Sequence, residues 1–213
     1  MKITCRILWL RGIPVCCWLA GLFLGSLTVW ADSSNQKEFY LDWLAVVFAD
    51  ERAAMVFVDD FEKQFAESGS ALDQALWGGA LLARAHHEPS LFRKRGLYRN
   101  GVHHLNEAMG AEPENARIRL TRATGFSLLP VAAGLAETTH QDFQKLLEDA
   151  EAVGEMEMRL RFEIFMRAGA WFVREGNERA LPVLKKAEEL ASRVNGGEER
   201  LKPLLDAAKT VGN

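Results

Sequence analysis

The segment AMGAEPENARIRLTRATGFSLLP, residues 108–130, contains the end of one predicted helix and the whole of the next. We expect the first helix to stop before Pro113, because proline has no N–H to donate inside a helix. The side chain of Asn115 can accept hydrogen bonds from the first turn of a helix, so this residue predicts the start of the second. Apolar residues at helical spacing then continue that helix through Ile118, Ala123 and Phe126.

Helical spacing of apolar residues extends along the chain from Gln36, and no run alternates between apolar and polar residues as a half-buried strand does. The predicted apolar faces cover residues 39–48, 54–65, 72–83, 98–109, 118–126, 143–153, 160–171, 180–191 and 201–208. Most connections between them are short, which places neighbouring helices antiparallel. The sequence therefore predicts an all-α protein of about nine helices arranged as antiparallel hairpins.

Turn and capping residues mark where several of these helices begin and end. Gly176 and the NGG sequence at 195–197 are expected to end helices, because glycine readily adopts the left-handed conformation found there. Thr139 is predicted to cap the helix over 143–153 with its hydroxyl group. The last helix, over 201–208, is expected to be short.

The N-terminal segment differs in composition from the rest of the chain. Three basic residues, Lys2, Arg6 and Arg11, are followed by an almost wholly apolar run that ends at Ala31. This order is typical of a secretory signal peptide, so we expect residues 1–31 to be removed and residues 32–213 to form a single periplasmic or secreted domain. The alternative is an uncleaved membrane anchor, because the apolar run 13–30 has 18 residues and a membrane span needs about 17–25.

Cysteine usage and charge limit the possible partners. Cys5, Cys16 and Cys17 all lie in the N-terminal segment, so the cleaved protein would have no disulfide bond and no thiol nucleophile or thiolate ligand. The formal net charge of −3 is unlike the basic surface of nucleic-acid-binding proteins, and no nucleic-acid partner is expected. Membrane contact is expected only through the N-terminal segment, if that segment stays uncleaved.

Three segments share spacings of four and three residues, and in two of them the side chains are small, bulky and small in that order. They are Gly101, Leu105 and Ala108; Phe143, Leu147 and Ala150; and Ala180, Leu184 and Ala187. Small side chains let two helices approach closely, and the larger middle side chain fills the groove between them. The same close approach is expected at Gly78 and Gly79, which lie inside a predicted helix beside Trp77.

This pattern resembles the second helix of the tetratricopeptide repeat, which has small, bulky, small and proline residues at these spacings. AMGAEPENA, residues 108–116, is similar to the end of that repeat, and AGAWFVREGNERALPVLKKAEELA, residues 168–191, is similar to most of one unit. Ala108, Ala150 and Ala187 are 42 and 37 residues apart, whereas the repeat has about 34. The resemblance therefore implies a degenerate tetratricopeptide-like solenoid, and an irregular helical bundle is the alternative.

A narrower similarity covers residues 76–147, with LWGGALLARA, GVHHLNEAM, PENARIRLTRA, LLP and DFQKLL in that order. These sequences resemble a group of exported bacterial tetratricopeptide-like proteins of unknown function. The similarity covers about a third of the chain. It implies a fold and a compartment but no activity.

Two arginines stand where the repeat usually has apolar residues. Arg119 and Arg122 are three residues apart and share a face of their helix. They can present guanidinium groups to a carboxylate of a partner, or form an internal clamp with Asp142 or Glu137 as the acceptor. As a third alternative, their stems cover apolar surface while their charged ends stay in water. Arg117 is expected to face solvent.

No motif in the sequence indicates catalysis or cofactor binding. The chain has no G-x-S-x-G sequence, no phosphate-binding glycine loop and no H-E-x-x-H sequence. His86 and His87 lie near a hairpin turn, and His103 and His104 lie about twelve residues past the start of the next helix, or roughly 18 Å from the turn at 1.5 Å per residue. No shared metal site is therefore expected. We therefore expect no enzymatic activity, no cofactor and no metal.

The expected function is non-catalytic binding by a scaffold or adaptor in the bacterial envelope, whose concave face holds a protein or peptide partner. The alternative is a small-ligand-binding protein associated with a transporter. That alternative predicts a single deep cavity lined by Trp77, Phe126 and Trp171. An enzyme would instead require titratable groups without structural partners, gathered in one cleft.

Overall fold

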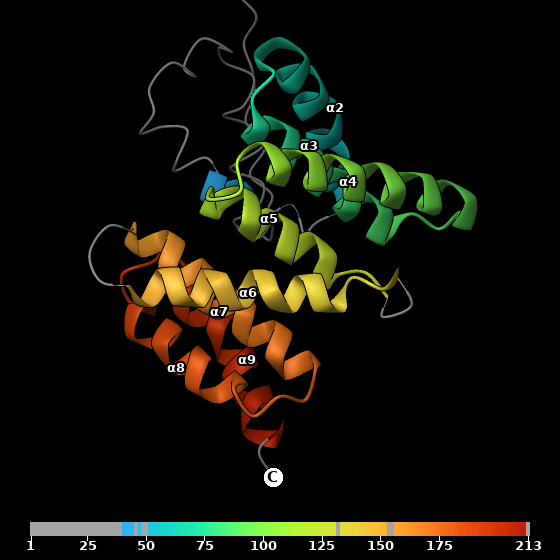
Figure 1. The fold of residues 1–213 in the computed structure, drawn as a ribbon. Helices are drawn as coiled ribbons and strands as arrows, with labels where there is room; N and C mark the ends of the chain where they lie inside the picture. Colours follow the sequence, from blue (N-terminus) through green and yellow to red (C-terminus); the bar gives the residue numbers. More distant parts are fainter. Residues whose placement is uncertain (1–39, 45–46, 48–50, 131–132, 153–155, 212–213) are drawn as a thin grey trace, which may run out of the picture. The chain divides into compact units, whose positions relative to one another are not determined.

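The computed structural model describes residues 40–211 except 45–46, 48–50, 131–132 and 153–155, and the regular elements within these residues are helices (Figure 1). Residues 40–44 are helical. The longer helices are α2 (Glu51–Ser68), α3 (Ala71–His87), α4 (Leu91–Ala111), α5 (Ala116–Ser127), α6 (Ala136–Glu151), α7 (Met158–Arg174), α8 (Ala180–Ala191) and α9 (Gly197–Val211). The all-α prediction is confirmed for this part of the chain.

Several sequence predictions concern residues that the structure does not describe. They include the signal peptide over residues 1–31 and its cleavage after Ala31. Phe39, Phe48 and Val153, which were assigned to predicted apolar faces, also lie outside the described residues. Among the residues described, no helix is both long enough and apolar enough to span a bilayer.

The predicted helix boundaries around residues 108–130 are confirmed. Helix α4 ends at Ala111, before Pro113. The Asn115 side chain accepts hydrogen bonds from the N–H groups of Arg117, at 3.0 Å, and Ile118, at 3.4 Å. This satisfies two of the N–H groups that have no partner within a first helical turn.

Two other boundary predictions are wrong. Thr139 does not cap α6, because the helix begins at Ala136, directly after a turn in which Gly134 has φ of 72°. The Thr139 hydroxyl is buried inside the helix and donates to the Leu135 carbonyl at 2.8 Å. Helix α9 is longer than expected, since Gly196 at φ of 66° turns the chain and the helix starts at the next residue.

Neighbouring helices approach closely where a glycine of one helix faces a leucine of the other. A Cβ atom on Gly78 would lie 3.0 Å from the Leu105 Cγ atom of α4, and one on Gly101 would lie 2.7 Å from a methyl group of Leu82. A Cβ atom on Gly169 of α7 would overlap Leu184 of α8. The expected close packing at Gly78 is therefore confirmed, and the Gly–Leu contact recurs in the α3–α4 and α7–α8 pairs.

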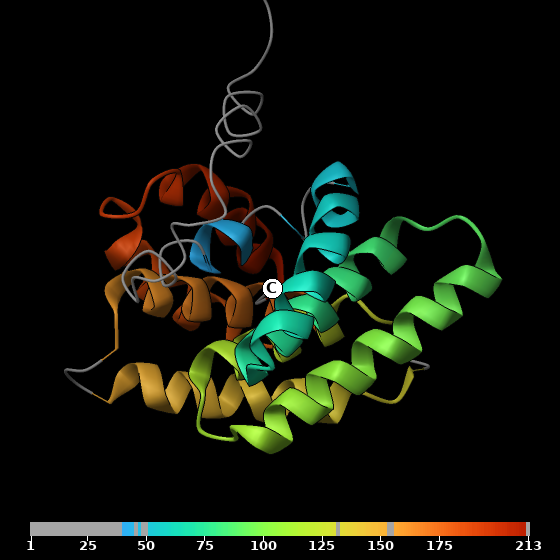
Figure 2. The same ribbon diagram turned by 90° about the horizontal axis from the view of Figure 1, so that it is seen from above.

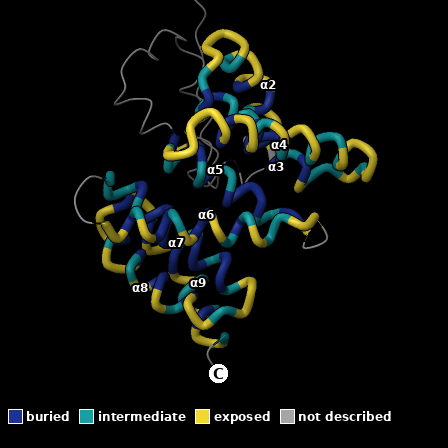
Figure 3. Tube along the Cα trace, in the orientation of Figure 1, coloured by how far each residue is buried: buried dark blue, intermediate teal, exposed yellow. Residues whose placement is uncertain are grey.

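Alternate helices also contact one another. Helix α5 packs against both α3 and α7, and α7 packs against α9, while α4, α6 and α8 pack against their sequence neighbours. Buried residues are most frequent on α3, α5 and α7 (Figure 3). These three helices are therefore the central ones, and the face they form carries the helical residues 40–44, drawn in blue in Figure 2.

Candidate functional site

The helical residues 40–44 are held by the side chains and backbone of α3 and α5. The Tyr40 hydroxyl donates to the Arg117 carbonyl at 2.9 Å and lies 3.2 Å from the Thr121 hydroxyl. The indole of Trp43 lies where a Cβ atom on Gly79 would be only 3.0 Å away. Burial raises the pKa of the Tyr40 hydroxyl far above its ordinary value, so this group remains a hydrogen-bond donor at neutral pH.

Helices α2 and α7 hold the same segment from its other sides. Trp43 makes an edge-on contact with Phe61 of α2, with ring centroids 5.5 Å apart. From α7, Arg167 donates to the Leu44 carbonyl at 2.6 Å, and Arg159 pairs with the exposed Asp42 at 2.6 Å. We call the surface of α3, α5 and α7 that contacts residues 40–44 the segment face.

A buried carboxylate fixes the α7 side of the segment face. Glu163 is 3% exposed and accepts two hydrogen bonds from Arg200 of α9, at 2.7 and 2.9 Å, and one from Arg167, at 3.1 Å. Burial alone would raise the pKa of Glu163, but the two guanidinium groups outweigh it and hold the pKa below its ordinary value. Glu163 therefore stays ionised and orients Arg167 toward the Leu44 carbonyl.

The lowered pKa of Glu163 predicts how stability changes in acid. The ion-pair contribution is fully present above the ordinary pKa of 4.5 and is lost as the pH falls through the lower, folded-state pKa. We expect the difference in unfolding free energy between the wild type and Glu163→Gln to shrink as the pH is lowered from about 7 to about 3. Urea titrations at each pH measure this difference, and a difference that stays constant would contradict the assignment.

Arg119 and Arg122 form an internal clamp on one carboxylate. Arg122 donates to both oxygens of Asp142 of α6, through Nε at 2.8 Å and Nη2 at 2.7 Å, and Arg119 adds a contact at 3.4 Å. Asp142 is 2% exposed, and the two arginine side chains are 14% and 15% exposed. Of the two acceptors considered from the sequence, Asp142 is the one that receives them, while Glu137 accepts from Gln141.

Further contacts join this clamp to α4. Arg122 also donates to the Asn106 side chain at 3.3 Å, and Arg119 donates to the Pro113 carbonyl. The clamp therefore connects α4, α5 and α6 on the side of α5 that carries these arginines. Whether Arg119 and Arg122 also contact a partner stays a prediction.

The prediction that Arg117 faces solvent is wrong. Its side chain is only 22% exposed, pairs with Glu157 at 3.2 Å, and lies over the Tyr40 ring with 5.9 Å between the guanidinium carbon and the ring centroid. The reason is the segment of residues 40–44, which covers this side of α5. Arg117 is thus part of the segment face.

The chain matches no family model, no curated protein and no solved structure. The resemblance to tetratricopeptide repeats stays a prediction.

The three aromatic residues predicted to line a single cavity have different surroundings. Trp77 stacks on His104, with ring centroids 4.0 Å apart, and on Phe65, at 5.8 Å. Phe126 is buried in the core formed with α3 and α4, and Trp171 is 5% exposed beneath the guanidinium group of Arg174. Each side chain is thus packed against its own neighbours in the fold.

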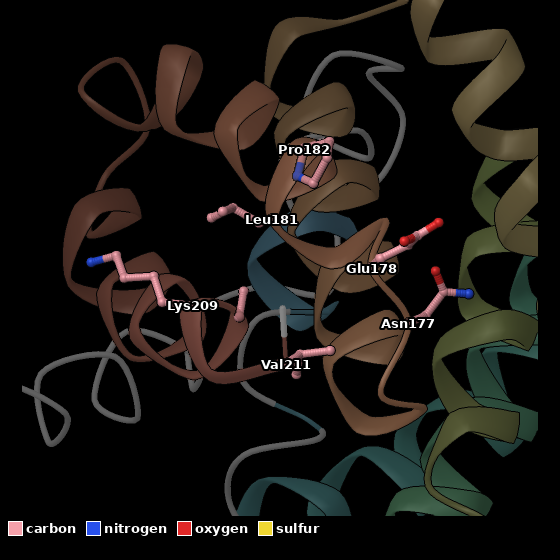
Figure 4. Close-up of a pocket in the computed structure, with 7 residues that line it drawn as sticks. Asn177, Glu178, Leu181, Pro182, Lys209 and Val211 are labelled. Carbon is pink, nitrogen blue, oxygen red and sulfur yellow. The ribbon is translucent and has the colours of Figure 1, made fainter. Parts of the chain in front are cut away.

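Two surface depressions are lined by other residues. One, of about 220 Å³, lies between α8 and α9 (Figure 4) and is lined by Asn177, Glu178, Leu181, Pro182, Ala208, Lys209 and Val211. The other, of about 270 Å³, is lined by Met55, Arg84, His87, Glu88, Pro89 and Arg93. Neither depression is lined by Trp77, Phe126 or Trp171. These two depressions are therefore not the cavity that the small-ligand alternative predicts.

The histidine pairs remain separate from each other. The rings of His86 and His87 lie 5.1 Å apart, and those of His103 and His104 lie 5.4 Å apart. Burial, assisted by His103, lowers the pKa of His104, which keeps this ring neutral at pH 7 against Trp77. Within the described part of the chain, no three His, Cys, Asp or Glu side chains converge on a point where a metal ion could bind.

Sequence reasoning missed the residues that anchor the segment face. Glu163 and Arg167 are four residues apart and interrupt the apolar run of α7, which is the signal that could have identified them as a buried pair. Their partner Arg200 lies 37 residues from Glu163, and nothing local predicts that contact.

Proposed function

We propose that this protein is a non-catalytic scaffold of the bacterial envelope. Its segment face would bind a partner protein by holding a helical segment of that partner that bears aromatic residues. The observation that carries the proposal is the way the segment face holds the chain's own residues 40–44. It buries Tyr40 and Trp43 to 1% exposure, donates to a backbone carbonyl and pairs with a carboxylate at the exposed edge. Apolar pockets combined with a few charged contacts are the means by which helix-lined grooves bind helical segments.

We also propose that α3 to α9 form a degenerate tetratricopeptide-like solenoid. The contacts between alternate helices and the recurring Gly–Leu approach at Gly78–Leu105 and Gly169–Leu184 support this arrangement. In such solenoids the first helix of each pair lines the concave surface. The segment face, built from α3, α5 and α7, would then be the concave surface, and the Asp142 clamp would support it from the other side of α5.

Binding of a partner on the segment face requires competition with residues 40–44. The Asp42→Arg variant is designed to favour the partner, because it replaces the attraction to Arg159 with repulsion at an exposed position, where Asp42 is 68% exposed. Asp206→Arg is the matched control, since Asp206 is 61% exposed and also pairs with a basic side chain, Lys209. Both variants change the net charge by the same amount and leave the buried residues intact.

The experiment is a pull-down from an envelope extract with the wild type, Asp42→Arg and Asp206→Arg as baits. We expect Asp42→Arg to retain several-fold more of one protein than the other two baits. A synthetic peptide of residues 36–50 should release that protein, and a scrambled peptide should not. Equal capture by all three baits, or release by neither peptide, would place any binding surface elsewhere.

A further inference from the structure

The turn between α3 and α4 exposes two large apolar side chains. Leu91 is 76% exposed and Phe92 is 88% exposed, at the first two positions of α4. Nearby on α2, Met55 and Val56 are 51% and 59% exposed, and Met55 shares a surface depression with Arg84 and Arg93. At this exposure Leu91 and Phe92 contribute little to the core, and contact with another apolar surface would bury them.

Basic residues follow these apolar side chains directly. The sequence from Leu91 is LFRKRGLYRN, which places Arg93, Lys94, Arg95 and Arg99 in the first three turns of α4. The first turn contains no acidic residue, and Ser90 makes no side-chain cap. Cations near a helix N-terminus are unfavourable because that end already carries partial positive charge. The sequence thus tolerates two locally unfavourable features at one place, exposed apolar groups and misplaced cations.

The charge of this region is opposite to that of the whole chain. Residues 74–106 contain five Arg or Lys residues and one acidic residue, Glu88, whereas the formal net charge of the chain is −3. Glu88 accepts from the Ser90 N–H at 2.9 Å and from Arg93 at 3.2 Å, so its charge is already engaged. The α3–α4 turn is therefore a local positive surface with an apolar tip.

We propose that the α3–α4 turn docks on the surface of an anionic phospholipid bilayer. Leu91 and Phe92 enter the boundary between headgroups and acyl chains, while Arg93, Lys94 and Arg95 contact headgroup phosphates. Arg95 lies about 5 Å behind Leu91 and Phe92 along the helix, at 1.5 Å per residue. In a bilayer the anionic headgroups lie outside the apolar acyl chains, in the same order as the basic residues behind the apolar tip. Apolar side chains of membrane-surface helices enter this boundary to a depth of about 5–10 Å.

A bilayer fits these features better than an acidic protein does. A folded protein surface would have to present both an apolar pocket for two adjacent side chains and a surrounding ring of carboxylates. An anionic membrane supplies both everywhere on its surface and attracts each added basic residue. This contact is additional to any membrane contact of the N-terminal segment, and it does not depend on the proposed scaffold function.

The test uses the full chain and a readout confined to the turn. Hydrogen–deuterium exchange of residues 90–95 is measured without vesicles, with phosphatidylcholine vesicles, and with vesicles that also contain phosphatidylglycerol, whose anionic headgroups attract basic segments. The N–H groups of Leu91, Phe92 and Arg93 have no partner within the helix, so they are expected to exchange quickly and to report membrane protection most clearly. Vesicle affinity is measured in parallel by co-sedimentation.

Two variants remove the two chemical elements of the contact separately. Leu91→Ser/Phe92→Ser removes the apolar tip, and Arg93→Glu/Arg95→Glu reverses two of the exposed charges proposed to contact phosphates. Lys202→Glu/Lys209→Glu on α9 is the matched control, because it makes the same change in net charge at exposed positions elsewhere. None of these residues is buried, so all three variants are expected to fold.

We expect anionic vesicles to slow exchange at residues 90–95 in the wild type and in the α9 control, and to bind both at least about tenfold more tightly than neutral vesicles. Both turn variants should lose the protection. Absence of protection at residues 90–95 would overturn the proposal. An equal loss of affinity in the α9 control would also overturn it, because that result indicates general charge attraction.

Discussion

Replacing Asp142 with alanine is expected to lower the unfolding free energy by about 3 kcal/mol, because it leaves two arginines without their carboxylate. This loss is at the lower end of the range for breaking a buried ion pair, because the side chains of Arg119 and Arg122 are still 14% and 15% exposed. For a domain of this size the melting temperature should fall by roughly 6–12 °C. Thermal unfolding followed by far-ultraviolet circular dichroism measures the change.

Asp149→Ala is the control for this experiment. Asp149 lies on the same helix and pairs with Lys145 at 2.7 Å, the same distance as the shorter Arg122–Asp142 contact. The two carboxylates differ in exposure, 34% for Asp149 and 2% for Asp142. Exposed pairs contribute about 0–1 kcal/mol, so Asp149→Ala should change the melting temperature little. Similar losses in both variants would mean that the clamp contributes no more than a surface ion pair.

Trp43→Ala is expected to reduce the unfolding free energy by about 3–5 kcal/mol, the range for deleting a buried indole. Trp43 is 1% exposed and fills the space between Gly79 of α3 and Phe61 of α2. Because glycine and a ring edge line this space, the surrounding backbone cannot close it without moving helices. Urea unfolding should show a lower midpoint.

Phe92→Ala provides the comparison for Trp43→Ala. It removes an aromatic ring that is 88% exposed, and surface substitutions of this kind usually stay within about 0.5 kcal/mol. Equal midpoints for the two variants would show that residues 40–44 contribute no more to stability than an exposed turn.

Several helix boundaries followed from residues that lie within one turn of them. Pro113 and Asn115 marked the boundary between α4 and α5, and Gly176 has φ of 64° at the turn after α7. Thr139 misled because a hydroxyl inside a helix can donate to the carbonyl four residues earlier, as it does here to Leu135. A capping residue type alone therefore does not fix where a helix starts.

The candidate site followed from the sequence only in part. Asp142 was one of two acceptors expected for Arg119 and Arg122, because both acceptors follow the loop that comes after the helix of these arginines. Arg117 was misplaced because its neighbour Tyr40 is 77 residues away, and helical spacing carries no information about such a contact. The segment face depends on the path of the chain, which the repeat pattern did not specify.

The position of residues 40–44 has a consequence for the order in which the chain can fold. The Leu44 carbonyl and Arg167 are 123 residues apart, whereas the helix pairs form between neighbours in sequence. Synthesis starts from the N-terminus, so Tyr40 and Trp43 exist long before α7 has been made. We expect the Arg167–Leu44 contact to form last, slowed by the large loop it closes, whereas Trp43 can pack against Phe61 and Gly79 once α2 and α3 have formed. Until α7 is made, residues 40–44 lack the hydrogen bond from Arg167 and are held only by their contacts with α2, α3 and α5.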